Sequence, residues 1–355
     1  MKYGTISANP HKYFSDWTDY PNITRVGEFS LDEQRNHTND ERASARYLLK
    51  KYSQTSILKE ALDLRAGYSS WVPNSRNDKF RHIQRWIAST AQWGATLEEV
   101  VDAEIVVNRG TLERIAISPY DIRNGIKLVC RKYKGVIFMT DFNCPTRAHK
   151  EALMAQCPQS RAQEYGDHKF EQLISSPDQS GVCDSWQPVN SKVEFYAVLN
   201  ADFDGLKVLY RAKIDCLSPD GNQYAEAKTQ AHGLHVEAFH KKVLHWWLQT
   251  YLATVDRIVI GIRNSMGMVE KIEYMNTDSL WNYSKKGKAD ICFVFLKTCL
   301  KTIRNIMADL NEGDVLVVEC EPGSDDFNFK VINEDENIWG GQYDIVEDFL
   351  KKRFQ

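Results

Sequence analysis

LKVLYRAKIDCLSPDGNQYAEAKTQ, residues 206–230, predicts two β-strands joined by a Pro-Asp-Gly turn. Ionisable residues recur at alternate positions, so their side chains share one face of the strands. A loop of two or four residues would set Asp215 opposite Glu226 and Lys213 opposite Lys228. A three-residue loop with a bulge would shift the pairing by one residue and send Asp215 and Glu226 to opposite faces. The length of the loop therefore decides whether a site forms here.

An aspartate on one strand followed by Glu-x-Lys on the next is the arrangement used by nucleases of the D-(D/E)xK type. Two carboxylates bind a hard divalent cation, which polarises a phosphate and activates water, and the lysine positions the nucleophile or stabilises developing charge. The same spacing also suits an exposed hairpin with mixed charges on its solvent face, and this segment alone favours that interpretation. Other segments must decide between the two.

The rest of the chain predicts a mixed α+β domain. Residues 1–100 are expected to be mainly helical, with helices at Asn39–Leu49 and Phe80–Trp93, and residues 101–355 to form the sheet core. An amphipathic helix from Val236 to Val255 is expected to pack on the sheet. The absence of repeats and of linker-sized Pro/Gly tracts favours one domain, 1–355. Other elements are predicted at Ala103–Val107, Ile126–Cys130, Val136–Thr140, Val193–Leu199, Arg257–Ile262, Met268–Tyr274, Ile291–Met307, Val315–Cys320 and Tyr343–Phe354.

The composition limits the classes of function. With 45 basic and 48 acidic residues, the net charge of −3 gives no global positive field, so any nucleic-acid site must be a local groove. The chain has no apolar run near the roughly 18 residues that cross a bilayer, and its polar opening lacks the apolar core of a signal peptide. The dispersed cysteines favour reduced thiols. We therefore expect an intracellular protein of the nucleus and/or cytoplasm that does not enter a membrane.

Two segments before the hairpin resemble the eukaryotic decapping exoribonuclease (DXO) family. The stretch from Gly27, GEFSLDEQRNHTNDERASARYL, resembles the N-terminal segment of that family. The stretch from Glu104, EIVVNRGTLERIAISPYD, resembles its arginine motif and places the arginine at Arg109.

Three later segments continue the resemblance in the order of the family. DHKFE, ending at Glu171, is similar to the glycine-aromatic-x-aromatic-Glu motif. The hairpin supplies the Glu-x-Asp motif at residues 213–215 and the Glu-x-Lys motif at residues 226–228. WWLQTYLATVDRIVIGIRN, from Trp246, resembles the helix and strand that place a glutamine in the active site, here Gln249. The match covers most of the chain.

The resemblance implies two mixed β-sheets flanked by helices, around a pocket for the 5′ end of RNA rather than DNA. It implies a hydrolase that uses Mg²⁺ or Mn²⁺ to remove incomplete or NAD-type caps and 5′ diphosphate, with 5′–3′ exoribonuclease activity in many members. By position, Lys228 and Gln249 would act near the attacking water and Arg109 would hold phosphate. The implied metal ligands are Glu171, Asp215, Glu226 and the main-chain carbonyl of Ala227.

One departure from the family matters most, because Lys213 stands where the family has a metal-site glutamate. In the register that builds a site, Lys213 would face Lys228 and the two ammonium groups would repel, at a cost of roughly 0.2–1 kcal/mol. An ammonium group at this position can also occupy the place of the cation. The alternative function is therefore a catalytically impaired member that binds RNA 5′ ends or docks a 5′–3′ exoribonuclease. Smaller departures are Asp167, His168 and Ala227.

Overall fold

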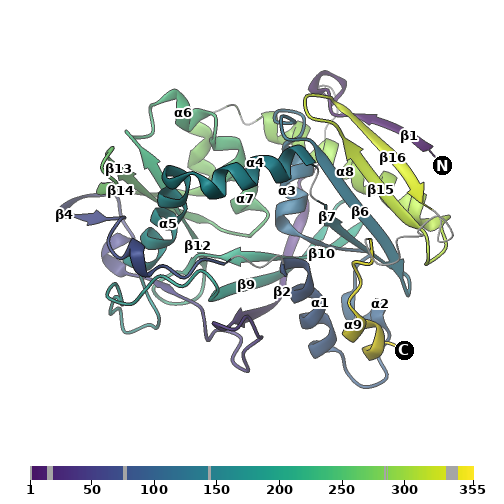
Figure 1. Cartoon of the computed structure of the whole chain (residues 1–355), viewed down its shortest axis with the longest axis horizontal. Coiled ribbons are helices and arrows are strands. Elements are labelled where there is room, and N and C mark those ends of the chain that lie inside the picture. The colour runs from purple at the N-terminus through teal and green to yellow at the C-terminus, as the bar shows by residue number, and fades with distance from the viewer. Residues whose placement is uncertain are drawn as a thin grey trace.

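Two β-sheets flanked by helices make up the protein, as the computed structural model in Figure 1 shows. The structure describes residues 2–13, 19–74, 78–142, 145–283, 285, 287–332 and 343–355. Both sheets contain parallel and antiparallel neighbours. The prediction of two mixed sheets flanked by helices is therefore confirmed.

The larger sheet has nine strands within the described residues. Its middle strand pairs, β10 with β5 and β5 with β7, run parallel, and the other pairs are antiparallel. In order across the sheet the strands are β1 (Lys2–Ser7), β16 (Asp326–Ile332), β15 (Val315–Cys320), β6 (Ile126–Tyr133), β7 (Val136–Asp141), β5 (Ile105–Asn108), β10 (Lys207–Ile214), β9 (Glu194–Asp202) and β2 (Asn22–Leu31).

The smaller sheet has seven strands within the same described ranges. Its parallel pairs are β12 with β13 and β11 with β3. In order across the sheet the strands are β4 (Ser56–Asp63), β14 (Met268–Asn276), β13 (Arg257–Arg263), β12 (Tyr224–Ala231), β11 (Cys216–Leu217), β3 (Tyr47–Leu48) and β8 (Ser175–Ser176).

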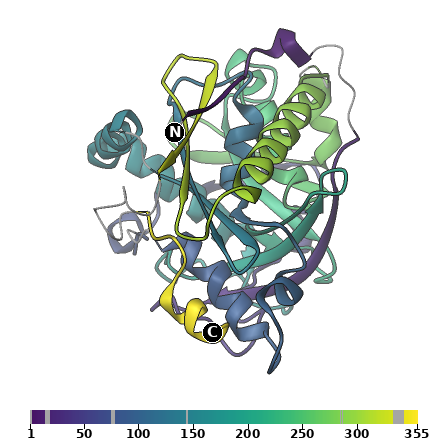
Figure 2. The same ribbon diagram turned by 90° about the vertical axis from the view of Figure 1, so that its right-hand side faces the viewer.

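Helices cover both faces of the nine-stranded sheet. Alternate residues of β10 point to opposite faces, so Val208 and Tyr210 join one apolar cluster while Leu209 joins another. The long helix α8 lies along the first face (Figure 2), and α1 and α9 supply Ile83 and Leu350 to the cluster on the second. The helices are α1 (Lys79–Thr90), α2 (Leu97–Val101), α3 (Arg109–Ile117), α4 (Pro145–Gln156), α5 (Pro158–Leu173), α6 (Glu237–His240), α7 (Val243–Tyr251), α8 (Gly287–Ala308) and α9 (Asp348–Arg353).

Two of these helices position the site. Helix α5 packs on the seven-stranded sheet, where Phe170 contacts the cluster that contains Ala225 and Ala227 of β12. Helix α7 packs against α3 and α8 and buries Trp247 in the main core. Polar residues on the remaining faces of α5 and α7 are thereby held near the end of β10.

The prediction that residues 1–100 are mainly helical is wrong, because β1 to β4 all lie in this region. The helix predicted at Asn39–Leu49 does not form. The hydroxyl of Ser30 accepts a hydrogen bond from the Ser44 N–H at 3.0 Å, and such side-chain bonds compete with a helix for the backbone. Tyr47 and Leu48 instead form β3. The helix predicted at Phe80–Trp93 is confirmed as α1.

The helix predicted from Val236 to Val255 forms as two separate helices, α6 and α7. Its apolar stripe is buried as predicted, since Phe239, Val243 and Trp247 are all in the main core. No helix in the described part of the chain is both long and apolar enough to cross a membrane. The cysteines that the structure describes are free thiols, and Cys144 lies outside the described residues.

Candidate active site

The hairpin at residues 206–230 forms with a four-residue loop. The Ser218 N–H donates to the Gln223 carbonyl at 2.7 Å and closes the loop Pro219–Asn222. Cys216 pairs with Ala225, which is the register expected for a loop of this length. Asp215 and Glu226 therefore come to the same side, and the three-residue loop with a bulge is excluded.

The two arms of the hairpin belong to different sheets. Strand β10 lies in the nine-stranded sheet, where Lys213 pairs with Tyr196 of β9, whereas β11 and β12 lie in the seven-stranded sheet. Asp215 is the residue at the crossing. The prediction that Lys213 faces Lys228 as a like-charge pair is therefore wrong, because the cross-strand pairing stops at this crossing.

Glu226 on β12 is fixed by one of its two carboxylate oxygens. Its Oε1 accepts hydrogen bonds from the Lys228 ammonium and from the Gln249 amide, the latter at 2.5 Å. Its Oε2 is buried and has no hydrogen-bond partner among the described residues. Since an unpaired buried carboxylate oxygen is costly, this atom is the clearest sign of a missing ligand.

Asp215 accepts a hydrogen bond from the Ala227 N–H at 3.1 Å. Burial, and then the carboxylates of Glu171 and Glu226, raise its pKa to about 7. The raised pKa means that the negative charge of Asp215 is unfavourable in this environment, and a cation bound nearby would stabilise it.

Glu171 on α5 is bound by Lys213. The Lys213 ammonium lies 2.9 and 3.1 Å from the two Glu171 oxygens and 3.3 Å from Asp215 Oδ1. Burial opposes the negative charge of Glu171, yet the positive charges of Lys213 and His168 hold the pKa of Glu171 well below its usual range. Burial likewise opposes the charge of Lys213, but Glu171 and Asp215 raise its pKa well above the ordinary value. The lysine is therefore a fixed cation.

Arg109 is the first residue of α3 and points toward α7. Its Nη1 donates to the Gln249 carbonyl at 3.2 Å, while its buried Nε has no partner within the described ranges. One turn along α3, Glu113 contacts His245 of α7 at 3.5 Å. These contacts hold the two helices together and leave part of the guanidinium available to an anion.

Asp167 is a pocket residue that sequence reasoning noted only as a departure. It precedes Glu171 by four residues on α5, so both lie on one helix face. Its carboxylate accepts a hydrogen bond from the Thr229 hydroxyl at 2.6 Å, and burial raises its pKa. The four-residue spacing from Glu171 is the signal by which Asp167 could have been found.

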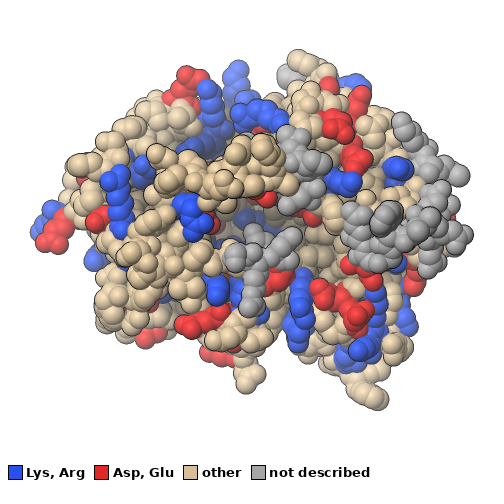
Figure 3. All heavy atoms as spheres, in the orientation of Figure 1, with Lys and Arg blue, Asp and Glu red and all other residues tan. Residues whose placement is uncertain are grey.

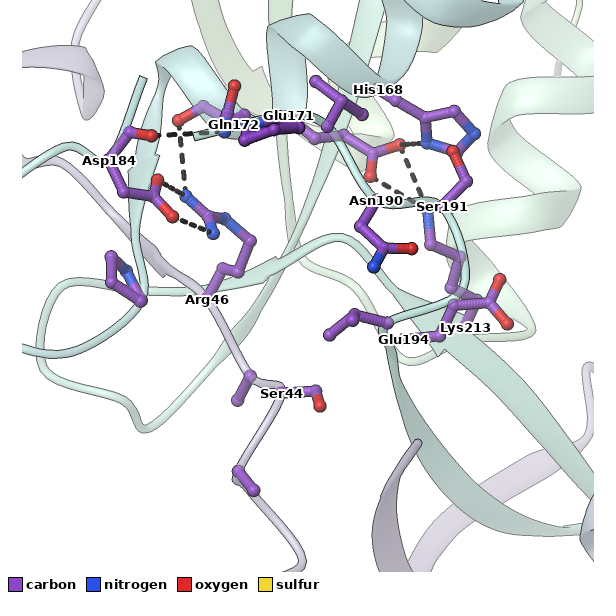
Figure 4. A pocket seen from close by; sticks show the side chains of 16 residues that line it. Ser44, Arg46, His168, Glu171, Gln172, Asp184, Asn190, Ser191, Glu194 and Lys213 are labelled. Carbon is purple, nitrogen blue, oxygen red and sulfur yellow. Dashed lines mark hydrogen bonds and ion pairs between the residues drawn. The ribbon is translucent and has the colours of Figure 1, made fainter. Parts of the chain in front are cut away.

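All side chains predicted for the site line one pocket of 180 Å³. A second pocket of 290 Å³ adjoins it, because both are bordered by Glu171 and Lys213 (Figure 4). The face drawn in Figure 3 is hollowed near its middle, where basic and acidic side chains are both visible. The roles of the residues in this pocket stay predictions. The smaller pocket is lined by Arg109, Asp167, Glu171, Lys213, Asp215, Glu226, Ala227, Lys228 and Gln249.

These residues fit a divalent cation in part. Carboxylate oxygens are the ligands that Mg²⁺ and Mn²⁺ prefer. Glu226 and Asp215 both line the pocket, and Oε2 of Glu226 has no partner among the described residues. Over the residues that are described, however, no group of three or more His, Cys, Asp or Glu side chains is arranged to hold a metal. The Lys213 ammonium contacts two of the pocket carboxylates, Glu171 and Asp215.

Comparison with protein families gives a match over nearly the whole chain. The family model described as "RAI1 like PD-(D/E)XK nuclease" matches residues 22–355. Decapping nuclease dom-3 of Caenorhabditis elegans is 29% identical over 279 residues, which are 73% of this chain and 67% of that protein. The decapping and exoribonuclease protein of Bos taurus is 26% identical over 344 residues, which are 90% of this chain and 83% of that protein.

The fold also matches solved structures. Candida albicans Rai1 in complex with pU5-Mn²⁺ has a TM-score of 0.80 to this chain, with 18% identity and 99% of each chain covered. At this identity the likeness shows the shared fold.

Proposed function

Because the chain belongs to the RAI1-like PD-(D/E)XK nuclease family, we propose that it is a metal-dependent hydrolase of RNA 5′ ends. Its substrates would be RNAs with incomplete or NAD-type caps or a 5′ diphosphate, and it would also degrade RNA from the 5′ end. The names of the relatives, a decapping nuclease and a decapping and exoribonuclease protein, support this proposal.

One observation carries the proposal, the free Oε2 of Glu226 in a pocket that Asp215 shares. Lys228 and Gln249 bind only Oε1, so they orient the carboxylate and leave Oε2 without a partner among the described residues. Most buried carboxylate oxygens in proteins have a hydrogen-bond partner, so a buried oxygen without one calls for an explanation. The arrangement suits a ligand that arrives from solution.

Mg²⁺ or Mn²⁺ would be held by Glu226, Asp215 and the main-chain carbonyl of Ala227, with Glu171 in the set that the family resemblance implies. When bound, such an ion polarises a phosphate oxygen and lowers the pKa of water.

The chain's own residues would orient the other reactants. The Lys228 ammonium stays charged, since Glu226 and Asp215 outweigh burial and raise its pKa. Together with the Gln249 amide it would position the attacking water by hydrogen bonding. Arg109, with its free Nε, would hold a phosphate of the RNA end, because a guanidinium binds phosphate oxygens in a fork.

The second candidate function is a family member that binds RNA 5′ ends without cutting them. The Lys213 ammonium favours it, since it already neutralises Glu171 and Asp215. A 5′–3′ exoribonuclease as protein partner stays a prediction from the resemblance.

The test is incubation of the wild-type chain with RNAs that carry unmethylated, NAD-type, diphosphate and monophosphate 5′ ends, with Mn²⁺ or with EDTA. We expect released cap products that require Mn²⁺, and at least a hundredfold slower release by Asp215→Asn. Lys207→Met, on the strand β10 that precedes Asp215 but exposed and paired with Asp102, is the control and should match wild type. Binding of these RNAs without any product would support the second candidate, and neither binding nor product would refute both.

A further inference from the structure

The Lys213 ammonium is surrounded by carboxylate oxygens. Two of them belong to Glu171, at 2.9 and 3.1 Å, and the third is Oδ1 of Asp215, at 3.3 Å. Figure 4, which draws the larger pocket, shows the ammonium and the Glu171 carboxylate facing each other. Both residues also line the smaller pocket. An ammonium group has three N–H donors, so these oxygens are enough to use all of them.

The part of the pocket around Glu171 and Asp215, called here the Lys213 side, therefore already contains a counter-ion, the Lys213 ammonium. Glu171 and Asp215 come from α5 and from the crossing between the sheets, and Lys213 bridges them as a cation would. Any metal ion placed between these two carboxylates would have to displace a lysine that is only 26% exposed in its side chain. Displacement would leave the ammonium in the pocket beside the incoming positive charge.

The part of the pocket around Glu226, called here the Glu226 side, differs because one carboxylate oxygen there has no partner among the described residues. Glu226 also has a lysine partner, but Lys228 and Gln249 both bind Oε1, and Oε2 remains without a partner in the described part of the structure. The Glu226 side chain is 1% exposed, so water in bulk does not satisfy that oxygen. Among the described carboxylates that line the smaller pocket, the buried oxygen without a hydrogen-bond partner therefore belongs to Glu226.

We infer that the Lys213 ammonium takes the place of one divalent cation, so that the pocket binds a single Mg²⁺ or Mn²⁺, on the Glu226 side. Glu171 is then the counter-ion that positions Lys213 rather than a metal ligand. The inference rests on the proposed function and makes it more specific. One half of the pocket would hold the permanent positive charge of Lys213, and the other half would hold an exchangeable metal ion.

The number of Mn²⁺ ions bound per chain tests this without substrate. Free Mn²⁺ can be counted from its electron paramagnetic resonance signal during titration of the wild-type chain, Lys213→Met and Lys213→Glu. We expect one tight ion in wild type and two in each variant, because the carboxylates of Glu171 and Asp215 then lack a counter-ion. Lys207→Met should keep one ion.

Two ions in wild type, or one ion in both Lys213 variants, would overturn the inference. Should the variants fail to fold, as judged by circular dichroism, the wild-type count alone decides. Assaying the same wild-type samples with capped RNA separates the two claims. Two ions with product refute the inference but keep the hydrolase, one ion without product keeps the inference but refutes the hydrolase, and no ion refutes both.

Discussion

Two buried charge clusters include a residue of β9 or β10, Glu194 in one and Lys213 in the other, and they are completed differently. In the cluster of Arg35, the guanidinium donates to Asp78 through Nε and Nη2 and to Glu194 through Nη1, at 2.6–2.9 Å. A further bond from Nη1 reaches the Lys192 carbonyl. In the pocket cluster, Glu226 Oε2 and Arg109 Nε have no partner within the described residues.

The difference separates a structural cluster from a binding cluster. Arg35 is 1% exposed in its side chain and every nitrogen of its guanidinium has an acceptor, so nothing from solution is needed. The pocket also has buried charges, among them Glu226 at 1% exposure of its side chain, but it leaves hydrogen-bonding capacity unused. Burial of charge alone thus does not identify the site, whereas burial with an incomplete set of partners does.

The largest effect is expected in the closed cluster. Arg35→Met keeps most of the apolar stem but removes the guanidinium that binds Asp78 and Glu194. The free energy of unfolding should therefore fall by about 3–5 kcal/mol. Urea unfolding at pH 7 measures this. Arg25→Met is the matched control, because Arg25 is 41% exposed and its Glu28 partner also binds Arg42, so the cost should stay below about 1 kcal/mol. Equal costs for the two variants would contradict the comparison.

An intermediate effect concerns pH. Burial, and then the charge of Arg211, lowers the pKa of His82 to about 4, although Asp78 lies 3.3 Å away. The unfolded chain takes up a proton below about pH 6.5 and the folded chain only near pH 4, so stability is present above pH 6.5 and falls as pH falls between these values.

We expect His82 to contribute about 2 kcal/mol to the loss of unfolding free energy between pH 7 and pH 4.5. Urea unfolding of wild type and His82→Gln at both pH values should show a smaller decrease in the variant. His37 stacks on His82 and its pKa is also lowered by burial, so it should account for part of the decrease in unfolding free energy that remains in the variant. A decrease of the same size in both proteins would show that His82 already takes up its proton in the folded state.

The smallest effect is expected in the open cluster. Glu226→Gln without metal should change the unfolding free energy by less than Arg35→Met does, because the lost attraction to Lys228 is offset by the lost repulsion from Asp215. Mn²⁺ should raise the melting temperature of wild type but not of the variant, since only the native state of wild type binds it. Differential scanning calorimetry with Mn²⁺ and with EDTA decides, and stabilisation of both proteins by Mn²⁺ would remove Glu226 from the metal site.

The alternation of residues and the Pro-Asp-Gly turn predicted the hairpin but left its register open, because loops of two, three or four residues all fit this sequence. The hydrogen bond between Ser218 and Gln223 decides for four residues. Sequence reasoning found Glu171, Arg109 and Gln249 only through a family resemblance, since these residues lie far apart in the chain and no local pattern links them. The partner of Lys213 was assigned wrongly for a related reason. Cross-strand pairing was extended from β11 back to Lys213, but the change of sheet at Asp215 is set by tertiary packing and leaves no mark in the alternation of residues.

The N-terminal strands were missed for another physical reason. In β4 most residues are exposed or only half-buried, so the strand carries little of the apolar alternation that identifies a strand from sequence. In β2 the buried positions fall at one end, from Glu28 to Leu31, where the strand approaches the core. Such strands are held by backbone pairing with β9 and β14 rather than by an apolar face of their own.

The crossing at Asp215 has a consequence for how this protein can vary. Because Lys213 is carried by one sheet and Glu226 by the other, a rotation of one sheet against the other changes the distances between the charges of the pocket. Core residues such as Ile258 and Leu217 belong to the apolar cluster that also contains residues of α7 and of both sheets. We expect substitutions in this core to change the affinity of the pocket for an ion that these residues do not contact, so the chemistry of the pocket can vary without changes among its charged residues.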